Sequence, residues 1–314
     1  MKEIKPIVTI VICTYNRAEL LSDALDSLTK QSADISLFSI LIVNNNSSDN
    51  TQEVAQEFVQ NNSNSRLVTE SQQGLSYARN RGYLEAECEW VAYMDDDACA
   101  FNNFIERMIY VIENYNFDCF GGIFLPWYKY GKPAWFKDAY GTSRYILNRT
   151  GVLERGFVSG GNIVIKKSVL KKLCGFDTNI GMSGKKVSYG EETQLQVRMR
   201  KLGYTIGFDP ALKIDHLVNT YKQTPFWYIK SSYASGRDYW ITQQLDPTWP
   251  ILIRMFLGAS KNLIKEFAYK TPKLIKKNYY IQNWLIDTFR HFSYTIGCIH
   301  MGINTILKNM QRNK

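Results

Sequence analysis

Short apolar runs alternate with helix-like patterns through the first two thirds of this 314-residue chain. The runs are rich in β-branched residues, as buried strands are, and the segments between them repeat apolar residues every three or four positions, as helices do. Strands are predicted at 7–13, 38–43, 66–69, 90–94, 119–124, 158–165 and 205–208, and helices at 18–31, 50–59, 75–86, 104–114, 167–173 and 191–202. This order predicts an α/β fold, with a mostly parallel sheet and helices on both faces.

The last third of the chain differs in charge. Residues 1–210 carry 23 basic and 24 acidic groups, a balance of −1, and residues 211–314 carry 15 and 5, a balance of +10. The net charge of +9 therefore comes from the C-terminal part. We predict a sheet-containing domain at 1–219, with halves 1–125 and 126–219, and a basic amphipathic helical extension at 220–314.

Helical patterns in this extension cover 225–240, 251–270 and 279–309. The second pattern places Arg254, Lys261 and Lys265 on one face. It places a set of apolar residues on another: Leu252, Phe256, Leu263 and Phe267. A basic, aromatic surface of this kind indicates contact with anionic lipid or nucleic acid, and the alternative is a set of helices that pack as an interface or against the sheet. The apolar stretch 292–307 is shorter than the roughly 20 residues of a spanning helix, so it is expected to be interfacial or packed.

Three adjacent carboxylates, Asp95, Asp96 and Asp97, directly follow the predicted strand at 90–94. Oxygen ligands suit a hard divalent ion such as Mg²⁺ or Mn²⁺, and ligands of parallel sheets bind outside the carboxyl ends of the strands. Taken alone, the triplet is more simply explained as a solvated acidic turn that caps the next helix. Whether the triplet is a metal site or an acidic turn therefore depends on the other residues expected at this edge of the sheet.

Three further polar clusters are expected at the same edge of the sheet. Thr14-Tyr15-Asn16-Arg17 ends the first strand, residues 43–51 (VNNNSSDNT) end the second, and residues 74–82 (GLSYARNRG) open a helix. Each has an ordinary structural explanation as a cap, a turn or a helix start. Together with the acidic triplet, they would suit a nucleoside diphosphate bridged by a metal ion.

These motifs, TYNR, VNNNSSDNT, GLSYARNRG and MDDDA in this order, resemble those of the family 2 glycosyltransferases. The resemblance continues through residues 159–162 (SGGN), 175–177 (GFD), 190–195 (GEETQL) and 210–216 (PALKIDH) and covers about two thirds of the chain. It implies the nucleotide-sugar-binding fold known as GT-A, an α/β fold with a single Rossmann-like, mostly parallel sheet. It also implies a donor half at 1–125 and an acceptor half at 126–219.

The resemblance also implies roles for individual residues. The donor nucleotide would contact Thr14, Tyr15, Asn16, Arg17, Asn44, Asn46, Arg79, Asp95 and Asp96. Asn44 stands where the family commonly has an Asp that reads the base, which leaves the base open. A Mn²⁺ or Mg²⁺ cofactor would be held by Asp97, Asp95 and His216, although a lone His is more often structural. The acceptor side would include Gly160, Gly161, Asn162 and Trp135. Trp135 lies in the aromatic segment 126–156, which fits either a loop over a ligand or an ordinary packed excursion.

Glu191-Glu192 corresponds to the family's Glu-Asp pair, whose second residue is the usual catalytic base. Glu192 would take the proton of the acceptor hydroxyl in an inverting transfer, with Glu191 as the alternative base. Apart from the resemblance, two acids in the first turn of a helix are explained by the helix dipole.

We therefore expect a metal-dependent inverting glycosyltransferase that uses a UDP-, dTDP- or GDP-linked sugar and a hydroxyl on a glycan or lipid-linked acceptor, in the synthesis of surface polysaccharide or glycoconjugate. The alternatives are an inactive nucleotide-sugar-binding relative and a basic protein that binds nucleic acid or membrane. We expect no nucleic-acid partner and leave a homodimer open. The six cysteines form no CxxC pair, which fits a reducing cytosol. Together with the basic extension, this predicts a cytoplasmic protein attached to the inner face of the cell membrane.

Overall fold

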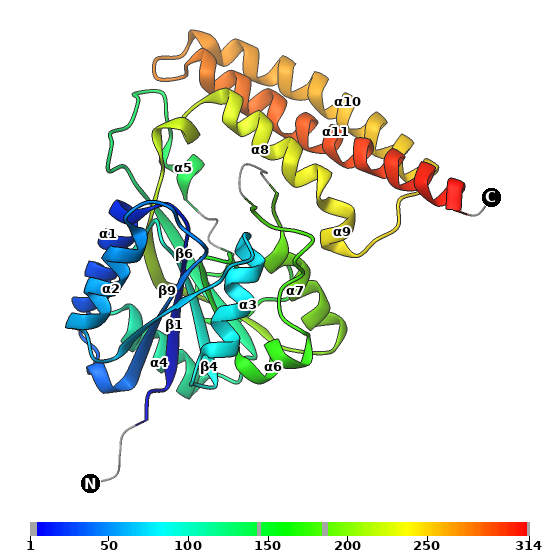
Figure 1. The fold of residues 1–314 in the computed structure, drawn as a ribbon. Helices are drawn as coiled ribbons and strands as arrows, with labels where there is room; N and C mark the ends of the chain where they lie inside the picture. The colour runs from blue at the N-terminus through cyan, green and yellow to red at the C-terminus, as the bar shows by residue number, and fades with distance from the viewer. Residues whose placement is uncertain (1–4, 143–145, 184–187, 313–314) are drawn as a thin grey trace. The chain divides into compact units, whose positions relative to one another are not determined.

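The computed structural model describes residues 5–142, 146–183 and 188–312. The chain divides into two compact units (Figure 1). The first comprises Met1–Trp127, Gly141–Gly184 and Glu191–Leu217, and the second comprises Tyr128–Tyr140, Lys185–Gly190 and Val218–Lys314. Residues 143–145 of the predicted aromatic segment, among them Tyr145, lie outside the described residues.

The described residues of the first unit form a nine-stranded sheet in the order β3-β2-β1-β4-β8-β6-β9-β5, with β7 beside β9. The strands are β1 (Val8–Thr14), β2 (Phe38–Asn44), β3 (Ser65–Thr69), β4 (Trp90–Asp95), β5 (Ala98–Ala100), β6 (Cys119–Trp127), β7 (Gly151–Val152), β8 (Asn162–Lys166) and β9 (Ile206–Leu217). Strands β1 to β4 are parallel, whereas β8 runs antiparallel between β4 and β6. The predicted Rossmann-like sheet is confirmed, with antiparallel pairings added on the β8 side.

Helices pack on both faces of this sheet, as predicted. They are α1 (Ala18–Thr29), α2 (Thr51–Asn61), α3 (Leu75–Glu85), α4 (Phe104–Asn114), α6 (Lys167–Lys172) and α7 (Glu191–Lys201), with the 3₁₀ turn η1 (Ile35–Leu37) before β2. Successive side chains of a strand point to opposite faces. In β1, Ile10 and Ile12 join the core beneath α1 and α4, and Val11 joins the core beneath α3 and α7. Both faces of β1 are therefore apolar, which is why it reads as a continuous apolar run.

Several strands differ from the prediction. Strand β8 begins at Asn162 and not at residue 158, and β6 continues beyond residue 124 to Trp127. Strands β5 and β7 were not predicted because three- and two-residue strands carry no periodic pattern. Strand β9 was predicted to end at residue 208, but it continues to Leu217 because its second part pairs with β6 and with β5. These pairings join segments that are distant in the sequence, and a local pattern cannot indicate them.

The carboxyl ends of β1, β2 and β4 meet at one edge of the sheet. Thr14 is the register partner of Asn44, and Cys13 is the partner of Asp95. The polar residues that follow these strands are therefore brought together, as ligand sites of parallel sheets are.

The second unit is mainly helical. Its elements are η2 (Thr220–Lys222), α8 (Pro225–Arg237), α9 (Tyr239–Gln243), α10 (Trp249–Lys270), η3 (Thr271–Ile275) and α11 (Ile281–Arg312), and α5 (Asp138–Gly141) ends at its border. Helix α11 packs against α8 and against α10 (Figure 1). The crossing of α8 and α11 is close, since a Cβ on Gly236 would lie 1.9 Å from the carbonyl oxygen of Tyr294.

The predicted stretch 292–307 lies within α11, where Gly297 and Cys298 are buried. A Cβ on Gly297 would lie 2.2 Å from the carbonyl oxygen of Tyr233 in α8, so this part of α11 is packed. Among the described residues, no helix combines the length and the apolar character needed to cross a bilayer.

Candidate functional site

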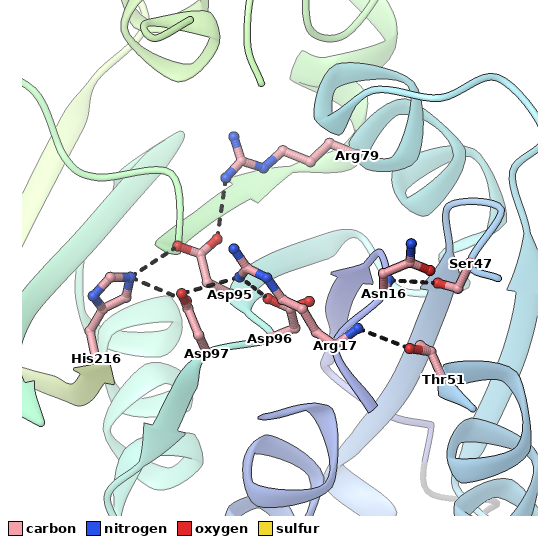
Figure 2. Close-up of polar contacts among 9 residues, drawn as sticks. All are labelled: Asn16, Arg17, Ser47, Thr51, Arg79, Asp95, Asp96, Asp97 and His216. Carbon is pink, nitrogen blue, oxygen red and sulfur yellow. Dashed lines mark hydrogen bonds and ion pairs between the residues drawn. The ribbon is translucent and has the colours of Figure 1, made fainter. Parts of the chain in front are cut away.

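Asp95, Asp97 and His216 lie together at the carboxyl end of β4 (Figure 2). Nε2 of His216 is 3.2 Å from Oδ1 of Asp97 and 3.7 Å from Oδ2 of Asp95. One potential ligand atom from each residue lies within 4.8 Å of the others. Two carboxylates and an imidazole form a donor set that a divalent cation such as Mn²⁺ can use. The cluster joins the three residues predicted from the sequence to hold a metal.

The fold positions His216 through two contacts. Ala98 of β5 is the register partner of His216 in β9, which brings the imidazole beside the residue before Ala98, Asp97. The ring of Phe124 stacks on the imidazole, with centroids 4.8 Å apart and planes only 1° apart. Sequence reasoning missed Phe124 as a supporting residue, since no motif includes it.

Asp96, the middle acid of the triplet, forms an ion pair with Arg17. Oδ1 of Asp96 accepts a 2.7 Å hydrogen bond from Nη1 of Arg17, and the same nitrogen lies 3.1 Å from Asp97. Burial raises the pKa of Asp96 above its usual value, and the positive charge of Arg17 opposes this shift. Arg17 and Asp96 were both predicted to contact the nucleotide, and here they form an ion pair with each other.

The TYNR and VNNNSSDNT segments are joined by hydrogen bonds. The backbone N–H of Asn16 donates to Ser47 Oγ at 3.0 Å, and that of Arg17 donates to Thr51 Oγ1 at 3.0 Å (Figure 2). Asn16 has φ 51°, a left-handed conformation that Asn tolerates better than most residues. Before this turn, Thr14 is buried and Tyr15 is 37% exposed, so Tyr15 is the one of the two that a ligand can reach.

The three consecutive asparagines have different surroundings. Asn44 is buried, its Nδ2 donates to Gln52 at 2.6 Å, and its Oδ1 accepts from the backbone N–H of Ser47 at 3.0 Å. Asn45 accepts from the backbone N–H of Gly74 at 2.8 Å and so joins two of the motifs. Asn46 is exposed and has φ 62°. The structure thus places Asn46 at the surface and uses Asn44 to hold the turn.

Arg79 connects the acidic triplet to the start of α7. Its Nη1 lies 2.6 Å from Oε1 of Glu191, and its Nη2 lies 3.5 Å from Oδ1 of Asp95. Arg79 is only 3% exposed, and its guanidinium also lies over the ring of Phe176 at 5.5 Å. Burial would lower the pKa of Arg79, but the charges of Glu191 and Asp95 outweigh that effect, so its pKa is raised. Arg79 was predicted to approach the nucleotide; here it bridges two acids.

The carboxylates of Glu191 and Glu192 differ in burial and in ion pairing, although the two residues are adjacent in α7. Glu191 is 5% exposed and paired with Arg79, whereas no other described residue forms an ion pair with the carboxylate of Glu192. Glu192 keeps part of its surface accessible to solvent, but the protein surrounds it closely. This burial, and next the charge of Glu191, raises the pKa of Glu192 above that of an ordinary glutamate. Glu192 is therefore a carboxylate with raised proton affinity and no ion-pair partner among the described residues.

The predicted acceptor-side residues occupy different places. Gly160 and Gly161 abut the site, since a Cβ on Gly161 would lie 2.0 Å from Oδ2 of Asp95. Asn162 is fully buried, and its Nδ2 donates to backbone carbonyls, at 3.2 Å to Leu212. Trp135 belongs to the second unit, where its ring packs against that of Phe136 and its carbonyl oxygen accepts from Asn283 at 2.8 Å.

Comparison with known proteins assigns the chain to a family. The sequence model described as glycosyl transferase family 2 matches residues 9–174, which is just over half of the chain. The chain belongs to this family. The assignment suggested by the sequence motifs is thereby confirmed, and the protein is a glycosyltransferase.

Curated relatives agree with this assignment. The glycosyltransferase is 27% identical over 243 residues to the glucosyl-dolichyl phosphate glucuronosyltransferase of Haloferax volcanii, a match that covers 73% of this chain and 75% of the relative. It is 26% identical over 204 residues to glycosyltransferase AglE of the same organism, covering 65% of this chain and 64% of the relative.

Solved structures show the same fold. A mannosyltransferase from Pyrobaculum calidifontis, in complex with GDP-Man and Mn²⁺, has a TM-score of 0.64 and 14% identity, over 95% of this chain and 87% of that one. Residues 1–349 of S. aureus TarS, in complex with UDP, have a TM-score of 0.55 and 15% identity, over 97% and 91%. At this identity the likeness concerns the fold alone, and it confirms the predicted GT-A type.

Proposed function

We propose that this glycosyltransferase transfers a sugar, with inversion at the anomeric carbon, from a nucleoside diphosphate donor to a hydroxyl acceptor. In this proposal Asp95, Asp97 and His216 hold a divalent cation, and Glu192 is the catalytic base. The observation that carries it is the arrangement of these groups. Arg79 pairs both with Asp95 of the carboxylate–imidazole cluster and with Glu191, and the next residue, Glu192, has a carboxylate that forms no ion pair with a described residue.

The cluster supports the metal part of the proposal through its donor chemistry. Its ligand atoms lie within 4.8 Å of one another, and Asp97 is nearly buried whereas Asp95 keeps 31% of its side chain exposed. A cation bound there, Mn²⁺ or Mg²⁺, would neutralise negative charge on the departing diphosphate. The neighbouring polar residues Tyr15, Asn16 and Asn46 remain candidates for contact with the nucleotide, because the turn that carries them lies at the same edge of the sheet.

The difference between the two glutamates supports Glu192 as the base. A base must accept the proton of the attacking hydroxyl, which requires a carboxylate that is not already held by a cation. Glu191 is held by Arg79, whereas Glu192 is not, and the raised pKa of Glu192 brings its proton affinity closer to what proton transfer near neutral pH requires. In this assignment Glu191 positions the start of α7 and Glu192 removes the proton.

The relatives support a nucleotide-linked donor and a glycan or lipid-linked acceptor. The solved neighbours were captured with GDP-Man and with UDP, and the Haloferax volcanii relative is named for a dolichyl phosphate-linked sugar. Synthesis of a surface polysaccharide or glycoconjugate is the setting we propose. Because lipid-linked acceptors lie in membranes, we include attachment to an anionic membrane surface in the proposal, supported by the +10 balance of residues 211–314.

One assay tests the reaction. UDP-, dTDP- and GDP-linked sugars are screened for thermal stabilisation of the protein with and without Mn²⁺, since a ligand that binds the folded state raises its unfolding temperature. The nucleotide sugar that stabilises the protein is then incubated with the enzyme until the sugar is slowly hydrolysed from it. NMR identifies which anomer of the sugar is released first. Metal-dependent stabilisation and release of the inverted anomer are expected. Retention of configuration would overturn the inverting mechanism, and stabilisation without turnover would favour an inactive binding protein.

A further inference from the structure

The apolar arc of helix α10 is wider than its contact with α11. Leu252 is buried and Leu263 is half-buried where α10 meets α11, and the ring of Phe267 contacts that of Trp284 in α11, with centroids 5.5 Å apart. Beside this contact, a set of apolar residues is between 45 and 72% exposed. We call it the α10 stripe; it consists of Trp249, Ile253, Phe256, Leu257 and Ile264. A helix that only had to pack on α11 would need a narrower apolar face, so the stripe requires a separate explanation.

A row of positive charge runs along one edge of the stripe. Arg254, Lys261 and Lys265 follow one another at seven- and four-residue spacing, so they share one side of the helix. All three are exposed, and none forms an ion pair with a described residue. The sole acidic residue of the sequence 249–277 is Glu266, whose carboxylate lies 3.7 Å from Lys270. The stripe is thus bordered by cations that no acid of the helix neutralises.

The positive charge continues beyond the end of α10. In the turn between α10 and α11, Ile275 is 91% exposed and stands between Lys273 and Lys276 in the sequence. Trp249 at the start of the helix and Tyr269 near its end are both exposed, and these residue types favour the headgroup region of a bilayer. Exposed apolar, aromatic and basic residues are therefore found from the start of α10 to the turn that follows it.

We infer that the α10 stripe and its basic row form the docking surface for an anionic lipid bilayer, on which α10 lies parallel to the membrane plane. The apolar side chains would enter the headgroup boundary while the basic row contacts lipid phosphates, as in interfacial amphipathic helices. The assignment rests on the membrane attachment included in the proposed function.

Charge complementarity favours lipid over a second copy of the chain. In a two-fold dimer the same surface meets itself, so each basic row would approach its equivalent, and the surface offers no acid to pair with it. An anionic bilayer presents phosphates at every position along the helix.

The experiment compares three variants of the full chain with the wild type in sedimentation with vesicles of phosphatidylcholine alone or mixed with phosphatidylglycerol. The first variant is Arg254→Glu/Lys261→Glu/Lys265→Glu, and the second is Leu257→Ser/Ile264→Ser. The control is Arg155→Glu/Lys171→Glu/Lys172→Glu, which changes the net charge equally at exposed positions of the first unit. Thermal unfolding and donor hydrolysis confirm that each variant is folded and active.

The wild type and the control are expected to bind the mixed vesicles and to be released by high salt. The partition coefficient of the charge-reversal variant onto the mixed vesicles should be about a hundredfold lower than that of the wild type. That of the serine variant should be about tenfold lower for each residue replaced. Equal binding by all four proteins would overturn the α10 assignment but leave membrane attachment standing, and no binding by the wild type would overturn both. A dimer that the serine variant dissociates, with unchanged vesicle binding, would assign the stripe to a second copy. None of these outcomes depends on transfer activity, so they are independent of the proposed reaction.

Discussion

The guanidinium of Arg79 donates a 2.6 Å hydrogen bond to the carboxylate of Glu191, and both side chains are almost completely buried. The other end of the guanidinium lies 3.5 Å from Asp95. One cation thus joins the acidic triplet after β4 to the first turn of α7, where Glu192 is the next residue. Neither the proposed metal site nor the proposed base can move far without disturbing this ion pair.

We predict that Arg79→Met destabilises the protein by about 3–5 kcal/mol, because it leaves a buried carboxylate without its cation. The double variant Arg79→Met/Glu191→Met should recover much of that loss. Urea unfolding measures both. Arg81→Met on the same helix is the matched control, since Arg81 forms a half-buried pair with Glu85, four residues along the helix, and its removal should cost at most about 0.5 kcal/mol. Equal effects at the two positions would contradict the buried-pair interpretation.

We predict that Asp97→Asn and His216→Gln each weaken Mn²⁺-dependent binding of nucleotide, because each removes a proposed ligand of the cation. Isothermal titration with a nucleoside diphosphate and Mn²⁺ measures the affinity. Asp215→Asn, which neutralises the neighbouring residue of β9, should bind as the wild type does, because alternate residues of a strand point to opposite faces. Unchanged affinity in Asp97→Asn would remove that residue from the metal site.

Glu192→Gln is expected to lower the rate of transfer by about a hundredfold to ten-thousandfold, because the amide cannot accept the proton of the acceptor hydroxyl. Donor affinity should be nearly unchanged. Glu191→Gln should act differently, since it weakens the ion pair with Arg79 and so lowers stability as well as activity. Steady-state kinetics together with thermal unfolding separates the two. Near-normal transfer by Glu192→Gln would show that another group is the base.

The pH dependence follows from the raised pKa of Glu192. A base works when deprotonated, so transfer should fall as the pH drops through this pKa, well above the usual range of a glutamate. Stability should show the opposite sign: a folded-state pKa above the unfolded value gives a contribution that is present at low pH and lost as the pH rises through the folded pKa. Glu192→Gln should therefore be relatively more stable than the wild type at high pH. A wild-type rate that is flat down to pH 5 would contradict the assignment.

Gly161→Ala tests the close approach at Asp95. The added Cβ would lie 2.0 Å from Oδ2 of Asp95, so the carboxylate must leave its present position, in which Oδ2 lies 3.7 Å from His216. We expect weaker Mn²⁺-dependent nucleotide binding in a protein that still folds, as seen by calorimetry and circular dichroism. Gly151→Ala is the control, because its Cβ would meet a neighbour at an ordinary 3.8 Å and should change neither measurement.

The elements of the first unit and the identity of the family could be read from the sequence, because both depend on local order. Helix α4 begins and ends at the predicted residues, β1 is displaced by one residue at each end, and β2 is one residue longer than predicted. Their apolar residues recur at the spacing of the element they form. The polar motifs follow the strands in a fixed order, and parallel pairing brings the ends of such strands to one edge.

The partners within the site were decided by tertiary structure. Arg79 and Glu191 are 112 residues apart, and His216 reaches Asp97 only because β9 extends beyond its predicted end to pair with β5. In α10 the pattern predicted Leu252 and Phe256 on one apolar face, but the structure buries Leu252 and leaves Phe256 about half exposed. Periodicity shows which side chains are apolar, whereas burial depends on what another segment places against them. The sequence determined the elements and the chemistry of their ends, and the packing of distant segments decided which groups became partners.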